Sequence, residues 1–318
     1  MSPKRQPRPR VWFTGTVQTR TALHIGTGSS LSVITDAPIL RGADGLPLVP
    51  GSSMKGALRS ACERLLRALG HRACMVFGDE EPGNAAHPTS EDTRITRCLT
   101  TDSSLSEVFY KLRRGDTLEA AERDIADRRW QLRRDEQRAF RLREDLQQRV
   151  IEKELCRACL TFGSQFMAGR IRVPDLRIDG SSWFGATEIR DGVGIDRDTG
   201  TAAHRIKFDL EVLPAGAAFR FELIAEPEAD LTVVALAVGE LLQGSLPLGG
   251  RTTRGLGEVK LVDFCIHEVD LANASQLVGY LTGGKEKGTV YRGDAAVTRL
   301  ESYLESLTSG TSGGQHAA

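Results

Sequence analysis

The stretch from Leu23 to Arg59 holds the residues of this chain whose types and spacing best suit chemistry. Asp36 is an acid in a loop segment, and Lys55 and Arg59 follow a Pro-Gly-Ser-Ser turn. The two cations are four residues apart, so a helix would place both on one face, where they could contact neighbouring phosphates. A single carboxylate can hold Mg²⁺, because this ion keeps most of its waters. The stretch therefore predicts a phosphate-binding surface with one carboxylate beside it.

The Pro-Gly-Ser-Ser turn predicts the start of a helix that runs to about Leu69. Ser52 or Ser53 is a suitable N-cap residue. A helix N-terminus offers unpaired backbone N–H groups and a partial positive charge, and the serine hydroxyl groups add donors. The glycine spacing differs from that of a P-loop. The alternative interpretation is a capped amphipathic helix on which Lys55 and Arg59 are solvated.

A second candidate site for phosphate is the glycine-rich segment Gly249–Gly257. Its glycines, Gly255 among them, permit positive φ angles and close backbone approach. Arg251 and Arg254 supply side chains that commonly contact phosphates. A simple hairpin turn would also explain the glycines, but it leaves the two arginines unexplained.

The cysteines suggest a metal site. Cys156 and Cys159 form a C-x₂-C pair, which is typical of one half of a zinc site, and Cys74 and Cys98 lie before a long intervening segment. Four thiolates would complete a tetrahedral, structural site for zinc. His71 is an alternative ligand. A redox function of the C-x₂-C pair lacks the sequence context that such a function requires.

Composition and charge limit the class of protein. The chain has 318 residues with 42 basic and 42 acidic side chains, yet residues 1–72 carry a net charge of +8. This local excess favours a polyanionic partner; a basic tail that aids solubility is the alternative. No apolar run reaches the roughly 20 residues of a membrane span. The basic N-terminus lacks a following apolar segment, so we expect a cytoplasmic protein with reduced or metal-bound cysteines.

Hydrophobic periodicity and composition predict five parts along the chain. Residues 103–155 are dense in charged residues and predict an inserted helix or helical hairpin with a solvated face. The predicted parts are a basic tail (1–10), a core (11–75 and 156–266), an insertion tied by zinc (76–155), a C-terminal extension (267–308) and a second tail (309–318). Within the core, the pattern predicts strands at 11–24, 169–173, 203–212, 218–225 and 258–266, and helices at 52–69 and 231–242.

Six segments of the chain together resemble the RAMP superfamily, the RNA-binding subunits of CRISPR effector complexes. The resemblance covers residues 11–75 and 156–266, and the three N-terminal segments occur in the family's order and at similar spacing. The segments are Leu23–Gly28, Asp36–Ile39, Pro50–Arg59, Thr161–Val173, Arg190–Gly200 and Gly250–Gly257. The three N-terminal segments are specific, whereas the glycine-rich segment alone would be weak.

The resemblance implies an α+β fold, a ferredoxin-like and RRM-related core whose helices cover one face of a sheet. It implies a backbone subunit of a type III complex that binds crRNA, with complementary target RNA and other RAMP subunits as partners. Residues Arg190–Gly200 would form the thumb hairpin that interrupts the guide–target duplex, and Arg190 and Arg197 would contact RNA. A zinc finger in some type III backbone subunits supports the predicted zinc site.

The resemblance also assigns roles to two residues of the first stretch. Asp36 matches the acid with which catalytic members cleave target RNA using a divalent metal; the alternative is a loop-capping acid in a non-catalytic, structural RNA-binding subunit. His24 would lie near the RNA backbone; the alternative is a histidine packed beside the sheet edge. A guide-processing endonuclease is a third hypothesis, but such enzymes generally lack the Pro50–Arg59 segment.

Overall fold

The computed structural model describes residues 8–28, 35–73, 155–164 and 167–309, with the side chains of 202–207 and of the last two residues excepted. The chain divides into two compact units, Met1–Leu65 with Arg170–Ala318, and Leu66–Gly169. The predicted helical insertion, Cys74, Cys98 and most of both predicted tails lie outside the described residues. The first unit contains both candidate phosphate-binding segments and Asp36.

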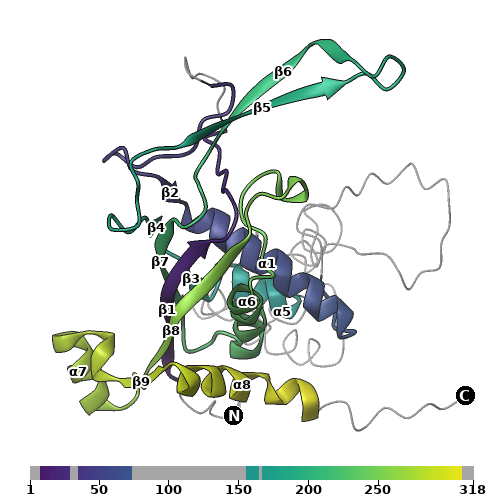
Figure 1. Cartoon of the computed structure of the whole chain (residues 1–318). Helices are drawn as coiled ribbons and strands as arrows, with labels where there is room; N and C mark the ends of the chain where they lie inside the picture. Colours follow the sequence, from purple (N-terminus) through teal and green to yellow (C-terminus); the bar gives the residue numbers. More distant parts are fainter. Residues whose placement is uncertain (1–7, 29–34, 74–154, 165–166, 310–318) are drawn as a thin grey trace, which may run out of the picture. The chain divides into compact units, whose positions relative to one another are not determined.

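Within the described residues, an antiparallel sheet of five strands forms the centre of the first unit, in the order β3-β7-β1-β8-β9 (Figure 1). Strand β7 pairs antiparallel with both β1 and β3, so β1 and β3 run in the same direction, and α1 lies in the connection from one to the other. Strands β7 and β8 likewise run in the same direction, because both pair antiparallel with β1, and α6 lies in their connection. This is the βαββαβ arrangement of ferredoxin-like folds, which the sequence predicts, with β9 as an added edge strand. The strands are β1 (Arg10–Thr19), β3 (Ile171–Arg172), β7 (Ala218–Ala225), β8 (Val259–Val269) and β9 (Thr289–Arg292).

The core forms on the sheet face to which alternate apolar residues of β1 point. Phe13 lies in register with Leu223 of β7 and Ile266 of β8, and all three side chains are fully buried. Helices α1 (Gly51–Ala68) and α6 (Leu231–Gln243) carry buried apolar residues, and an ion pair of 2.5 Å between Arg64 and Glu240 joins them. Asp230 caps α6 by accepting the N–H of Val233, so the predicted second core helix is confirmed.

Helix α1 already includes both serines that the sequence suggests as N-cap residues. Its first residue is Gly51, whose N–H donates to the carboxylate of Asp175 at 2.8 Å. A Cβ atom on Gly51 would lie 2.0 Å from the carbonyl oxygen of Val173, so only glycine fits there. The acid that caps this helix therefore comes from a segment more than a hundred residues away, which sequence spacing does not reveal.

The C-terminal extension completes the sheet and covers part of its second face. It comprises α7 (Ala274–Gly283), η3 (Lys285–Lys287), β9 and α8 (Asp294–Ser309), so the predicted strand at 258–266 is not the last. The Trp12 and Tyr280 rings lie 5.3 Å apart, centroid to centroid. Helix α8 is fixed to β8 by Glu268, which accepts hydrogen bonds from Arg299 and Tyr303.

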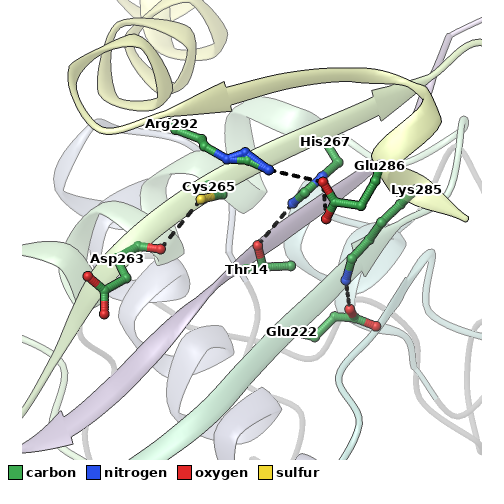
Figure 2. A network of polar contacts seen from close by, with 8 residues as sticks. All are labelled: Thr14, Glu222, Asp263, Cys265, His267, Lys285, Glu286 and Arg292. Carbon is green, nitrogen blue, oxygen red and sulfur yellow. Dashed lines mark hydrogen bonds and ion pairs between the residues drawn. The ribbon is translucent and has the colours of Figure 1, made fainter.

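A polar network fastens η3 to the second face of the sheet (Figure 2). Lys285 pairs with Glu222 of β7, and Glu286 lies 3.5 Å from Nδ1 of the buried His267 of β8. The Nε2 atom of His267 lies 3.3 Å from the hydroxyl of Thr14 on β1. Burial first, and then the nearby cations, hold the pKa of His267 below its ordinary value despite Glu286.

Two smaller antiparallel pairs accompany the sheet. Strands β2 (Leu48–Val49) and β4 (Leu176–Arg177) form one, and β5 (Glu188–Ile195) and β6 (Ala202–Val212) form a long hairpin. Most side chains of β5 are exposed. At the hairpin tip, the carboxylate of Asp196 accepts the N–H groups of two following residues, which lowers the pKa of Asp196.

Candidate nucleic-acid interface

The loop that carries Asp36 lies along the base of the β5–β6 hairpin. The N–H of Asp36 donates to the carboxylate of Asp209 at 2.6 Å, and the N–H of Asp209 donates to the carboxylate of Asp36 at 3.1 Å. Ala37 then forms a parallel bridge with Leu210, and its carbonyl accepts the N–H of Glu211 at 3.0 Å. These contacts hold Asp36 exposed and in a defined place beside β6.

Glu211 of β6 is a buried carboxylate with three donors. The N–H of Ile39, at 2.9 Å, the guanidinium of Arg41, at 2.6 Å, and the hydroxyl of Thr187, at 2.6 Å, all donate to it. Burial alone would raise the pKa of Glu211, but these three hydrogen bonds outweigh it and the pKa lies below its ordinary value. The residue is therefore an anion that binds the Asp36 loop to the hairpin.

His24 lies inside the protein, beside the same hairpin. Its Nδ1 atom donates to the carbonyl oxygen of Glu211 at 2.8 Å, and its ring is buried. Its own carbonyl oxygen accepts the N–H of Gly250 at 2.9 Å. A Cβ atom on Gly249, where φ is +80°, would lie 2.3 Å from that oxygen. The glycines at this point thus allow close approach to the protein's own backbone.

The arginines of the glycine-rich segment have different surroundings. Arg251 adopts a left-handed backbone conformation, and its guanidinium lies 4.5 Å from the ring centre of Phe208. That ring lies directly over Gly192 of β5, where a Cβ atom would be 2.3 Å from it. The stacking holds Arg251 against the hairpin. Arg254 and Gly255 are exposed at the outer end of the segment.

A cavity of about 480 Å³ separates one face of α1 from the glycine-rich segment. Most of the residues that line it are small, so a ligand could approach the backbone closely, and the lining cation is Arg64. Ser52, at the start of the helix, is exposed and lies outside this lining. The lining residues are Ile25, Gly26, Ser53, Gly56, Ala57, Ser60, Ala61, Arg64, Pro247, Gly249, Gly250 and Thr252.

Lys55 and Arg59 lie on another face of α1. The ammonium group of Lys55 donates to the carbonyl oxygen of Ile171 at 3.2 Å, and burial, followed by the repulsion of Arg59, lowers the pKa of Lys55. Arg59 pairs with Glu63 at 2.7 Å, and only 16% of its side chain is exposed. The structure therefore places both predicted cations in contacts with the protein, although they share a helix face as the sequence predicts.

The predicted RNA-contacting arginines of the hairpin are exposed. Arg190 lies on β5, where its guanidinium is 3.2 Å from the carboxylate of Glu188, and Arg197 lies in the turn between the two strands. Neither belongs to the lining of the cavity beside α1. The structure thus does not bring all predicted RNA-binding residues together: some lie around the glycine-rich segment, Arg190 and Arg197 lie on the hairpin, and Lys55 and Arg59 lie on another face of α1.

All four cysteines of the predicted zinc site belong to the second unit, and two of them, Cys156 and Cys159, lie in the described residues. Cys156 is the N-cap of α5 (Arg157–Phe162), and its sulfur accepts the N–H of Cys159 at 3.5 Å. Both cysteines are buried. Within the described ranges, no group of three or more His, Cys, Asp or Glu side chains could hold a metal ion. Cys74 and Cys98 lie outside those ranges, so the full set of four thiolates stays a prediction.

Sequence reasoning did not identify Glu211, Arg41, Thr187 or Arg64. The sequence does mark Glu211 as unusual, because this acid interrupts the apolar run Leu210–Leu213 at the end of a strand. A charged residue in such a run is buried only when its partners are present. Arg64 lies eight residues after Gly56 and extends the same small-residue face of α1, which periodicity could have revealed.

None of the helices within the described residues is long and apolar enough to cross a membrane. Comparison with curated proteins gave no match. The family model of the RAMP superfamily matches residues 16–260. The matched range contains the Asp36 loop, α1, the β5–β6 hairpin and the glycine-rich segment, and it indicates a CRISPR-associated role in binding RNA alongside other subunits of a CRISPR complex. Because the match covers well over half of its length, the chain belongs to the RAMP superfamily.

Proposed function

We propose that the chain is a backbone subunit of a type III CRISPR effector complex, which binds crRNA and cleaves complementary target RNA at Asp36. The observation that carries this proposal is the placement of Asp36. Its carboxylate is exposed, and its loop is bound to β6. The glycine-rich segment contacts His24, which is bound to the same strand. An RNA strand held by the glycine-rich segment would therefore pass close to a fixed acid.

The cavity beside α1 supports binding of the crRNA backbone. Small side chains on α1 and glycines opposite them leave room for a sugar-phosphate chain, and the hydroxyl groups of Ser53 and Ser60 can donate to phosphate oxygens. Arg64 lines the cavity, and Arg254 is exposed two residues after the lining residue Thr252, so both can neutralise phosphate charge. Such contacts read the backbone, so the RNA sequence should matter little.

The surroundings of Asp36 fit a divalent metal of the Mg²⁺ type. Such an ion needs only one or two carboxylates and fills its other positions with water and phosphate oxygens, and Asp36 offers an exposed carboxylate. When bound, the ion would stabilise the charge that develops on the attacked phosphate. The chain itself contributes the orientation of the carboxylate, which the N–H of Asp209 fixes.

We further propose a structural zinc ion held by Cys74, Cys98, Cys156 and Cys159. The N–H group of Cys159 donates to the sulfur of Cys156, and both cysteines are buried at the start of α5. The β5–β6 hairpin would act as the thumb that interrupts the guide–target duplex, and its exposed Arg190 and Arg197 would contact RNA. Other RAMP subunits would be its neighbours in the complex.

A reconstituted complex and labelled complementary RNA test the cleavage, with and without Mg²⁺. Asp36→Ala should abolish cleavage at this subunit's position and leave guide binding intact. Asp44→Ala is the matched control, because Asp44 is an exposed acid eight residues along. Its carboxylate accepts the N–H of Leu46 and lies 3.9 Å from the guanidinium of Arg177, so the variant should leave cleavage unchanged. Continued cleavage by the Asp36→Ala complex at that position would show that the assignment is wrong.

The second candidate function is a structural RNA-binding subunit without catalysis. The reciprocal hydrogen bonds between Asp36 and Asp209 favour it, because through them Asp36 holds the loop against β6. In that case the wild-type complex would not cut at this position. The Asp36→Ala variant would then lower only the stability of the loop.

A further inference from the structure

We infer that Glu211 is a positioning residue for Asp36: by anchoring the residues that follow Asp36 to strand β6, it sets where the Asp36 carboxylate lies. The inference rests on the proposed cleavage at Asp36 and deepens it. Nothing in the family match assigns a role to Glu211, and the residue touches neither RNA nor metal in the proposed reaction.

The carboxylate of Glu211 has more protein donors than a surface acid would have. The residue is only 9% exposed, and its donors come from the Asp36 loop (Ile39 and Arg41) and from the entry to β5 (Thr187). A buried carboxylate is tolerated where charged and neutral donors satisfy it, and hydrogen bonds to an ionised group are stronger than neutral ones. Glu211 therefore fixes these two segments relative to each other.

The backbone of Glu211 makes two further contacts at the same place. Its N–H donates to the carbonyl of Ala37 at 3.0 Å, and its carbonyl accepts from Nδ1 of His24 at 2.8 Å. His24 in turn accepts the N–H of Gly250. One residue thus connects the Asp36 loop, the hairpin and, through His24, the glycine-rich segment.

Strand geometry explains why Glu211 acts on Asp36. Asp209 and Glu211 are two residues apart on β6, so their side chains leave the strand on the same side. Asp209 holds the N–H of Asp36, and Glu211 holds the N–H of Ile39, three residues later. Two side chains of β6 therefore hold the loop, besides the backbone contacts of Ala37, and removal of the Glu211 carboxylate loosens the residues that follow Ala37.

Glu211→Gln is the sharpest variant, because it keeps the shape of the side chain. The amide replaces one accepting oxygen by an NH₂ group. This group then faces either the N–H of Ile39, which donates to Oε2, or the guanidinium of Arg41 and the hydroxyl of Thr187, which donate to Oε1. Glu226→Gln is the matched control. The carboxylate of Glu226 likewise accepts hydrogen bonds from guanidinium groups, those of Arg10 at 2.8 Å and Arg172 at 2.9 Å. Glu226 directly follows the last residue of β7 and makes neither of these contacts with the Asp36 loop.

The experiment combines hydrogen exchange with single-turnover cleavage in the reconstituted complex. In Glu211→Gln we expect the amide of Ile39 to lose protection while amides of α6 keep theirs. The cleavage rate at saturating target RNA should fall between about tenfold and a hundredfold, because a displacement of about 1 Å can cost a factor of 10². The affinity for target RNA should stay within about twofold, since phosphate contacts dominate binding. Glu226→Gln should match the wild type.

Each outcome decides the inference. An unchanged cleavage rate in Glu211→Gln, where Asp36→Ala abolishes cleavage, would overturn it and leave the proposed function intact. An equal loss in Glu226→Gln would also overturn it, because any lost ion pair would then suffice. If Asp36→Ala still cuts, the proposed function fails, and exchange at Ile39 still tests the anchoring. If Glu211→Gln loses protection in α6 as well, Thr187→Val, which removes one donor, should show a smaller cleavage loss in the same direction, and no loss would refute the inference.

Discussion

The carbonyl oxygen of His24 occupies the space in which a side chain on Gly249 would begin. A Cβ atom there would lie 2.3 Å from that oxygen, and the next residue, Gly250, donates its N–H to it. The glycine-rich segment can therefore contact the backbone at His24 only because residue 249 has no side chain. This contact brings together two segments that are more than two hundred residues apart in the sequence.

Gly249→Ala should destabilise the protein by roughly 2–3 kcal/mol, because it combines a left-handed backbone with a clash against another backbone. Urea unfolding measures this free energy. Gly239→Ala is the control with the opposite sign, since Gly239 lies within α6 with open space at its Cβ position and alanine should stabilise the helix by about 0.4–1 kcal/mol. Equal stability of both variants would contradict the assigned role of Gly249.

Affinity for guide RNA should fall as salt concentration rises and should change little when the guide sequence is scrambled. Arg254→Ala should weaken binding and flatten the plot of log K against log salt by about 0.7, the value for one phosphate contact on a single strand. Titration at several salt concentrations measures the slope. Arg220→Ala is the control, because Arg220 is an equally exposed cation on the second face of the sheet. A slope that Arg254→Ala leaves unchanged would remove this residue from the interface.

Zinc should be present at about one ion per chain, and Cys156→Ser should lower both the metal content and the melting temperature. The physical reason is that a closed thiolate site contributes its binding energy to folding. Metal analysis and thermal unfolding measure the two effects. Cys265→Ser is the control, since the thiol of Cys265 lies on β8 and donates to the carbonyl of Asp263. Native protein without zinc would end the proposal.

Stability should depend on the protonation of His267. Its pKa in the folded state lies below the ordinary value, so between the folded and the unfolded pKa the unfolded chain binds more protons. The free energy of unfolding should therefore not change with this protonation above about pH 6.5, and it should decrease as the pH falls below that value. Urea unfolding between about pH 5.5 and 7.5 measures this, and His267→Gln should lack this part of the decrease. Parallel pH profiles for the two proteins would refute the prediction.

The central elements of the fold were predictable because their patterns are local. Alternation in β1, the apolar face of α1 and the run in α6 each follow a period that one segment shows by itself. The C-terminal extension was less predictable. Strand β9 has four residues, and α7 has no buried residue, so neither shows a strong period. Their positions depend on contacts such as the pair between Lys285 and Glu222.

The candidate site was predictable in its parts but not in its orientation. The sequence identified Asp36, the glycine-rich segment and the i,i+4 pair of Lys55 and Arg59. It could not say which face of α1 would meet the cavity, because periodicity relates residues to one another and not to the rest of the protein. Lys55 instead donates to the carbonyl of Ile171, a residue brought near only by the sheet.

The sequence by itself determined the family, the α+β class and the candidate acid, because motifs and local periods depend only on residues that are close together in the sequence. Only the tertiary structure decided what holds that acid. Asp209 and Glu211 act on the Asp36 loop from about 170 residues away, and His24 meets Gly249 across more than two hundred residues. Such contacts depend on how strands and loops pack, so single-sequence spacing carries no record of them. At the glycine-rich segment, the residues that first indicated contact with phosphate also serve contact within the protein.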